Sequence, residues 1–242
     1  ELLDAELILV EDGHPRCTIV VAAEANEKER LAAAELQGYL HKITDALVPI
    51  ATDTAAVERS RILVGDNAIS RALALDLSGL SRDGYLIQVA GTDLVLQGET
   101  DQGTLNAVYA FLENHLHVRW FMPGELGEDL IPQSTIRLPD NLHEKQTPDF
   151  LALYGLKWSG HTQGAPAWER RNRARLGPSR YFFEHSFHFV ILETEAARET
   201  DPHWFARDAN GNNKRSGQLC TTNPEVIEIT IAKAAEYFEK HP

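Results

Sequence analysis

The sequence has little cysteine, no excess of basic residues and no long apolar run, and each shortage excludes a class of protein. Its two cysteines, Cys17 and Cys220, lie far apart, and two are too few for a disulfide scaffold or a cysteine-based zinc site. No apolar run approaches the roughly 18 residues that a membrane span requires. The opening ELLDAELILVEDG lacks the basic, apolar and small-residue order of a signal peptide. A secreted protein whose signal had been removed would begin in the same way.

Acidic residues outnumber basic ones, with 36 aspartates and glutamates against 23 lysines and arginines and a formal net charge of −13. A chain of this charge repels a phosphate backbone or an anionic membrane, so neither nucleic acid nor a membrane is a predicted partner. The basic cluster RRNRAR at 170–175 is interpreted as a solvated helix face or a local anion contact. Hydrophobic residues make up 43% of the chain, which is enough for a sizeable core in a folded protein.

Residues 1–140 are predicted to form one domain, a mixed sheet with two main helices. Asn26 followed by Glu29 has the spacing of a capping box, and the helix that begins there is expected to end near Thr44. Asp101 is the predicted cap of the second helix. YLIQVAGTDLVLQGE at 85–99 is typical of a hairpin. Further strands and a short helix are expected, in chain order, at 5–13, 17–23, 47–53, 61–64, 69–77 (the helix) and 134–139.

The pattern of predicted secondary structure changes after residue 140. Residues 141–149 are polar and contain a proline, so they are predicted to be a linker. Three short strands are expected at 150–156, 180–185 and 217–220, each followed by a loop and then by helical or irregular sequence. Repeated strand, loop and helix favours parallel strands joined by crossover helices. The fold class is therefore α/β, with a second domain at 150–242.

Long stretches of the sequence resemble parts of known glycoside hydrolases. LAAAELQGYLHKITDALVPI resembles the helix and strand of the small α/β domain that precedes the barrel in α-glucuronidases and β-hexosaminidases. QGTLNAVYAFLENHLHVRWFMPGELGE, DPHWFARDANGNNK and QLCTTNPEV are similar to a group of largely uncharacterised bacterial proteins related to those enzymes. The resemblance implies an accessory α/β domain followed by a (β/α)₈ barrel.

The resemblance also implies a reaction, which is hydrolysis of an O-glycosidic bond in a polysaccharide that contains uronic acid or amino sugar. It implies no cofactor and a secreted or periplasmic location. Two rival classes stay open: a non-catalytic carbohydrate-binding module, and a structural or interaction domain that braces a neighbour. Fold analogy alone does not decide among them.

A complete barrel takes about 250 residues, and only residues 150–242 follow the predicted linker. We therefore expect the chain to be the N-terminal portion of a longer protein, with the remainder of the barrel as its partner. Glycoside hydrolysis usually needs two carboxyl groups. In the related enzymes they come from later strands, so the catalytic residues are expected beyond Pro242. Glu184, at a predicted strand end, is interpreted as an arginine partner or a surface carboxylate.

The stretch FFEHSFHFV at 182–190 holds the strongest candidates for a sugar contact, His185 and His188. They are three positions apart with no third ligand nearby in the sequence, so no metal site is predicted. As neutral donors and acceptors they are expected to bind sugar hydroxyls, with Phe187 or Trp168 as an apolar platform. The resemblance favours this reading, because the related proteins carry an H-x-F-H-like loop at this strand. Burial of one or both histidines is the alternative.

Four further residues are predicted to bind substrate. Trp168, Arg171 and Asn172 are residue types that stack on a sugar acid or hydrogen-bond to it, and a helix that packs its tryptophan inward is the alternative. Asn223 precedes Pro224 and is explained by helix capping, with substrate binding as a second role. GELGE at 124–128 is expected to be a tight interdomain turn, with Trp120 and Phe121 packing the two domains together.

Overall fold

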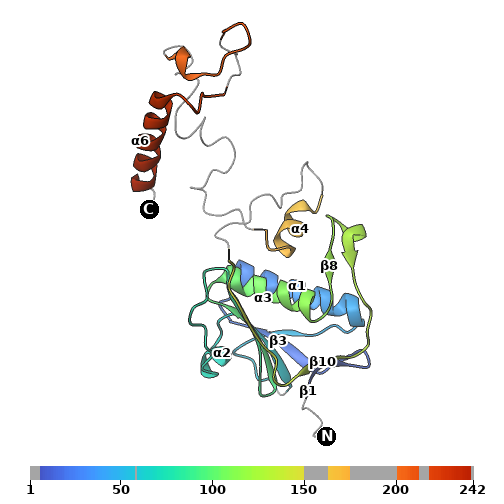
Figure 1. Ribbon diagram of the computed structural model, residues 1–242. Coiled ribbons are helices and arrows are strands. Elements are labelled where there is room, and N and C mark those ends of the chain that lie inside the picture. The colour runs from blue at the N-terminus through green and yellow to red at the C-terminus, as the bar shows by residue number, and fades with distance from the viewer. Residues whose placement is uncertain (1–5, 58, 150–162, 175–200, 213–217, 241–242) are drawn as a thin grey trace. The chain divides into compact units, whose positions relative to one another are not determined.

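The computed structural model describes residues 6–57, 59–149, 163–174, 201–212 and 218–240 (Figure 1). The chain divides into two compact units, residues 1–175 and 176–242. The predicted α/β class is confirmed, since helices and mixed sheets alternate along the chain. No helix within the described residues is long and apolar enough to cross a membrane.

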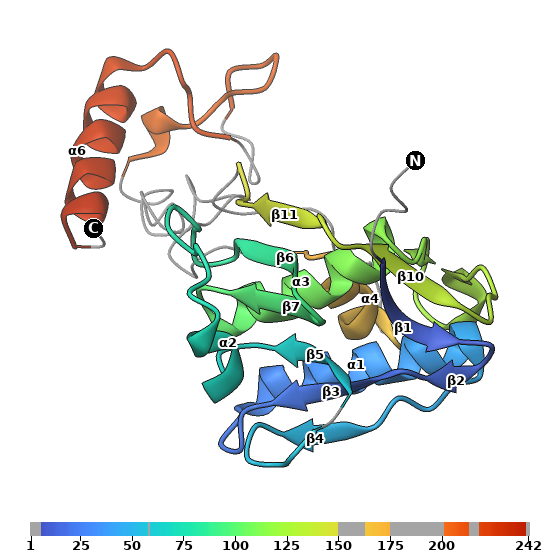
Figure 2. The same cartoon turned by 90° about the horizontal axis from the view of Figure 1, so that it is seen from below.

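A six-stranded sheet with the order β11-β6-β7-β5-β3-β4 forms the centre of the first unit (Figure 2). The strands β7, β5, β3 and β4 run parallel, and β6 and β11 continue the sheet antiparallel. Every residue of β3 and β7 is buried, as expected for strands covered on both faces. The bounds are β3 Cys17–Val21, β4 Ile50–Thr52, β5 Ser60–Val64, β6 Tyr85–Ala90, β7 Asp93–Gly98 and β11 His143–Gln146.

Shorter strands form two additional small sheets beside the main one. Strand β1 pairs with β10 and β2, and β8 pairs with β9, all antiparallel. A 3-10 turn, η1, lies between β8 and β9 and includes the glycine of GELGE that precedes Glu128. The bounds are β1 Glu6–Glu11, β2 His14–Pro15, β8 Arg119–Trp120, η1 Glu125–Gly127, β9 Glu128–Asp129 and β10 Ile136–Pro139.

Helices α1 (Glu27–Thr44) and α3 (Asp101–Asn114) cover one face of the sheet, and α2 (Ala68–Ala72) covers the other (Figure 2). The predicted capping box is confirmed, because the Asn26 side chain accepts from the Glu29 amide and the Glu29 side chain accepts from the Asn26 amide. The predicted cap of α3 is wrong by one residue. Thr100 caps the helix through its hydroxyl, 3.1 Å from the Gly103 amide. Asp101 is the first helical residue, where its charge favours the helix dipole.

The core of the first unit lies between the sheet and the pair α1–α3. Apolar residues at helical spacing along both helices are buried there, together with the large aromatic side chains of α3. A smaller cluster of Val20, Leu63 and Val95 packs under α2 on the opposite face. The buried stripe residues are Leu36, Leu40 and Ile43 on α1, and Leu105, Val108 and Leu112 on α3, with Leu116 just beyond the helix.

The predicted linker contains a strand. Residues His143–Gln146 form β11, which extends the sheet antiparallel to β6. Its sequence, HEKQ, is polar throughout, so it carries no apolar alternation that would mark a strand. The edge position explains this composition, because a polar edge strand avoids pairing with other chains.

The described part of the second unit is small. Its 3-10 turn η3 (Pro202–Trp204) leads to a bridge between Phe205 and Leu219, and the long helix α6 (Pro224–Lys240) follows. Val226 packs against Trp204, Phe205 and Leu219. The predicted strands at 150–156 and 180–185 lie outside the described residues. Three large apolar side chains of α6 are exposed, namely Ile227, Ile231 and Phe238 at 43%, 64% and 58%.

Two glycines on the two main helices differ sharply in their surroundings, which gives a matched pair of substitutions. A Cβ at Gly103 would lie 2.3 Å from the Gly84 carbonyl oxygen, whereas a Cβ at Gly38 would meet nothing within 4 Å. Gly103→Ala is expected to lower the free energy of unfolding by about 1–3 kcal/mol because backbone must move. Gly38→Ala is expected to raise it by about 0.5–1 kcal/mol. Urea unfolding of both variants tests this, and equal midpoints would contradict the close approach.

Candidate functional site

Helix α4 (Ala165–Arg171) carries two of the predicted sugar-binding residues, Trp168 and Arg171, and a third, Asn172, caps its end. The helix belongs to the first unit and lies over α1 and α3, on the side away from the sheet (Figure 1). Gly164 precedes it with a φ of +88°, a left-handed conformation that glycine adopts readily.

Arg171 binds two carboxylates from different elements. Its Nε and Nη2 donate to the Glu35 carboxylate on α1 at 2.9 and 3.1 Å, and its Nη1 donates to Glu128 on β9 at 2.9 Å. Its side chain is 20% exposed, and those of Glu35 and Glu128 are 13% and 9% exposed. A bidentate arginine–carboxylate pair of this burial is a strong, directional contact.

Glu128 is the centre of a hydrogen-bond network. Besides Arg171, it accepts from the Tyr39 hydroxyl and from the Lys42 ammonium, each at 2.6 Å. The Trp120 indole donates to the Tyr39 oxygen at 2.8 Å. The Arg171 and Lys42 cations also lie over the Tyr39 ring, 5.3 and 5.0 Å from its centroid, a cation–π arrangement.

Burial and hydrogen bonding shift the pKa values of this network. Desolvation opposes ionisation of Glu128, but the donors Lys42 and Tyr39 and the charge of Arg171 outweigh it, so the pKa of Glu128 lies below its ordinary value. Burial, followed by the hydrogen bond to Glu128, raises the pKa of Tyr39. Desolvation of Arg171 is outweighed by the Glu35 carboxylate, so the pKa of Arg171 is raised. All three groups therefore stay in their usual charge states at neutral pH.

The remaining polar groups of α4 converge on one backbone carbonyl. The Trp168 indole donates to the Trp120 carbonyl oxygen at 2.9 Å, and the Asn172 side-chain amide donates to the same oxygen at 3.2 Å. That amide also lies 3.0 Å from the Trp168 carbonyl. The indole packs partly buried against the core. The structure thus places the three predicted residues together, each with a donor bound to protein.

The other arginines of RRNRAR that the structure describes also bind the protein. Arg170 Nε donates to the Tyr109 hydroxyl at 3.1 Å, and Arg173 pairs with Glu113 on α3. Burial, with the Glu35 charge, raises the pKa of Tyr109 to about 12, so its hydroxyl is neutral at neutral pH. The prediction of a solvated helix face is wrong here, because the cluster meets acidic and phenolic groups contributed by distant parts of the chain.

Asn223 acts as the predicted cap of α6. Its side-chain oxygen accepts from the Glu225 amide at 3.0 Å, and its amide donates to the His203 carbonyl at 3.3 Å. His203 in turn lies 2.7 Å from a Glu225 oxygen through its ring nitrogen. Glu184, His185, Phe187 and His188 lie outside the described residues. No group of three potential metal ligands occurs in the part of the chain that the structure describes.

Of the two residues expected to pack the domains together, Trp120 is buried within the first unit, where its ring meets Tyr39 and Tyr109 edge-on at 5.6 and 5.8 Å. Phe121, the next residue, is 69% exposed. Sequence reasoning missed Glu35, Tyr39 and Glu128. All three lie within the stretches that resemble known glycoside hydrolases. No local spacing, however, relates Glu35 to an arginine 136 positions away.

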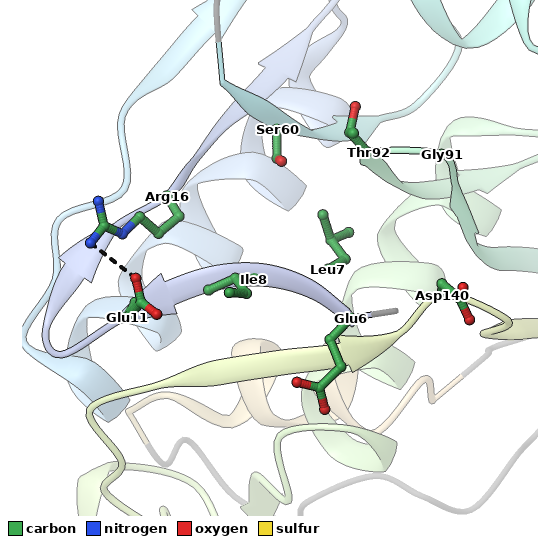
Figure 3. Close-up of a pocket in the computed structure, with 9 residues that line it drawn as sticks. All are labelled: Glu6, Leu7, Ile8, Glu11, Arg16, Ser60, Gly91, Thr92 and Asp140. Carbon is green, nitrogen blue, oxygen red and sulfur yellow. Dashed lines mark ion pairs between the residues drawn. The ribbon is translucent and has the colours of Figure 1, made fainter. Parts of the chain in front are cut away.

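A separate open pocket of about 610 Å³ lies beside β1 and is lined also by Ser60, Gly91 and Thr92 (Figure 3). Its Glu11 and Arg16 form an ion pair at 3.0 Å. The pocket lies at Ser60, the first residue of β5, whereas ligands of open α/β sheets bind outside the carboxyl ends of the strands. Of the predicted sugar contacts that the structure describes, Trp168, Arg171, Asn172 and Asn223 are not among its lining residues. Its lining residues are Glu6, Leu7, Ile8, Glu11, Arg16, Ser60, Gly91, Thr92 and Asp140.

Comparison with known proteins shows a fold similar to that of glycoside hydrolases. A family model described as "Domain of unknown function (DUF4838)" matches residues 123–242. A search of curated proteins found no similar sequence. The chain is similar in structure to a family GH115 4-O-methyl-α-glucuronidase, BtGH115A, with specificity for decorated arabinogalactans. The TM-score is 0.53 and the identity 13%, over 97% of this chain and 41% of that one.

Two other solved structures give lower scores. A Streptomyces plicatus N-acetyl-β-hexosaminidase has a TM-score of 0.37 at 13% identity, over 63% of this chain and 24% of that one. A Flavobacterium johnsoniae chitobiase has a TM-score of 0.36 at 10% identity, over 98% and 41%. Of these three structures, the glucuronidase has a TM-score above 0.5, and its likeness establishes a glycoside-hydrolase-like fold. The chain spans less than half the length of that enzyme.

Proposed function

We propose that this chain is the N-terminal portion of a glycoside hydrolase that cleaves O-glycosidic bonds in a polysaccharide containing uronic acid or amino sugar. The observation that carries the proposal is the likeness of nearly the whole chain to the 4-O-methyl-α-glucuronidase described above, at a TM-score of 0.53. Residues 1–140 are then the accessory α/β domain, and residues 150–242 begin a (β/α)₈ barrel. In such barrels catalytic groups sit at the carboxyl ends of the strands.

The predicted sugar contacts have different proposed roles. His185 and His188 are the proposed contacts to sugar hydroxyls, and the partly buried Trp168 is the proposed stacking platform. Arg171 and Asn172 donate to Glu35, Glu128 and the Trp120 carbonyl, so their part in sugar binding is to hold the platform in place. The proton transfer and attack belong to two carboxyl groups, which we place in later strands of the barrel. The proposed location is secreted or periplasmic.

Turnover by the natural polypeptide tests the proposal. The protein isolated from its source is expected to have an intact mass well above 27.0 kDa and to release sugar from 4-nitrophenyl glycosides or from uronic-acid or amino-sugar polysaccharides. Saccharide binding without release of product would instead support a carbohydrate-binding module. If the protein shows no binding and no turnover across such a panel, the result would favour a structural domain that braces a neighbour. The hydrogen bonds that the donors of α4 make within the protein support that candidate.

His185→Ala is the first substitution to make in that protein. Loss of a hydrogen-bonding ring from a sugar pocket is expected to weaken saccharide binding about tenfold, because one hydrogen bond to a ligand contributes about 1 kcal/mol or slightly more. Calorimetric titration measures the change, and the melting temperature is expected to stay constant. His41→Ala is the matched control, since His41 is exposed on α1. Equal affinities of wild type and His185→Ala would contradict the assignment.

A further inference from the structure

Helix α4 cannot owe its conformation to its own sequence. It has seven residues, and the preceding Gly164 offers no side-chain cap. Isolated helices shorter than about 12 residues are marginal in water. The helix therefore exists because its side chains dock on the rest of the first unit, so its position is set by those docking contacts.

The docking contacts form a closed circuit. Arg171 donates to Glu128, which accepts from Tyr39. The Tyr39 oxygen accepts from the Trp120 indole, and the Trp120 carbonyl accepts from Trp168, which lies one helical turn before Arg171. Each member of the circuit is thus oriented by the next, and a displacement of the arginine is transmitted to the indole.

Charge matching fixes where α4 docks. The arginines at 170, 171 and 173 meet acceptors on α1, α3 and β9, namely Tyr109, Glu35, Glu128 and Glu113. Arg171 alone bridges two carboxylates of different elements and supplies three hydrogen bonds. A lysine at this position would offer a single point charge in place of the planar fork. Arg171 is therefore the side chain on which the docking of α4 most depends.

We propose that Arg171 is a positioning residue for the sugar site: through Glu35 and Glu128 it holds α4, and thereby sets the place of the Trp168 platform and of Asn172. The role in sugar binding rests on the proposed hydrolase function, whereas the hold on α4 rests on the contacts alone. The two parts are separated by measuring them independently.

Hydrogen exchange measures the hold on α4. In Arg171→Ala, the amides of Trp168 and Asn172, which bond to the Gly164 and Trp168 carbonyls, are expected to lose protection at least tenfold. Arg171→Lys is expected to give an intermediate loss. Arg71→Ala is the control, because Arg71 makes an equally bidentate but exposed pair with Asp66. Unchanged protection of α4 in Arg171→Ala would overturn the proposal.

Kinetics of the natural protein on the 4-nitrophenyl glycoside that it hydrolyses best measure the role in sugar binding. Arg171→Ala is expected to raise KM at least tenfold with a smaller change in kcat, and Arg171→Lys is expected to recover part of the loss. A KM that stays constant while α4 loses protection would overturn the positioning of the platform and leave the hydrolase function intact. Absence of turnover by the wild type would overturn the hydrolase function, and the exchange experiment would still decide the hold on α4.

Discussion

Replacing Trp120 with alanine is expected to lower the free energy of unfolding of the first unit by about 3–5 kcal/mol. The side chain is 5% exposed, and its ring makes edge-on contacts with Tyr39 and Tyr109. Alanine would leave a cavity between α1 and α3 and would remove the indole donor of the Tyr39 oxygen. Equilibrium unfolding in urea, followed by circular dichroism, gives the change in free energy from the midpoint and slope.

The neighbouring residue supplies the control for Trp120. Phe121→Ala also removes an aromatic ring, directly after the strand that holds Trp120, but that ring is 69% exposed, so a change within about 0.5 kcal/mol is expected. Trp120→Phe should fall between the two, because it keeps most of the packing and loses the hydrogen bond. Similar losses for Trp120→Ala and Phe121→Ala would mean that Trp120 is not a core residue of this unit.

Local signals in the sequence account for most of the first unit. Asn26 and Glu29 cap α1 as their spacing predicts, and the hairpin at Gly91-Thr92 joins β6 and β7 as expected. In these places the contacts that define an element lie within a few residues, so the sequence alone carries the information. The cap of α3 shows the limit, since Thr100 and Asp101 are both good capping residues and only the hydroxyl contact to Gly103 decides between them.

Contacts between distant segments were beyond sequence reasoning. Strand β11 is visible only through its pairing with β6, because a polar edge strand has the composition of a linker. Likewise, tryptophan, arginine and asparagine near position 170 have the chemistry of a sugar site, and the same chemistry serves to dock a short helix. Whether these residues bind sugar or dock the helix depends on whether Glu35 and Glu128 lie within hydrogen-bonding distance of Arg171. That distance is set by how α1 and β9 pack.

The contribution of Glu128 to stability is expected to depend on pH. At pH 7, Glu128→Gln should lower the free energy of unfolding by about 2–3 kcal/mol, because the variant leaves Arg171 and Tyr39 with a neutral partner in a site where the carboxylate is only 9% exposed. The ion pair with Lys42 adds little, since that side chain is 43% exposed.

The direction of the pH effect follows from the shift in pKa. Burial opposes ionisation of Glu128, but hydrogen bonds and neighbouring cations lower its pKa in the folded protein below the ordinary value. The stabilisation by Glu128 is therefore complete above the pKa that a glutamate has in the unfolded protein, about 4.3. It is lost as the pH falls through the lower pKa that Glu128 has in the folded protein. The difference in free energy of unfolding between wild type and Glu128→Gln should be largest at neutral pH and should become smaller below about pH 4.

Urea unfolding of wild type and variant at a series of pH values measures this gap directly. Glu125→Gln is the control, because Glu125 lies three residues before Glu128 and is exposed. Its free energy of unfolding should stay within about 0.5 kcal/mol of the wild-type value at every pH. A gap that stays constant from pH 7 to pH 3 would mean that the carboxylate charge does not stabilise the fold. The network around Arg171 would then be held by packing, and acid would not release α4. A gap that closes with acid would identify the charge of Glu128 as the link that holds Arg171, Tyr39 and α4 together.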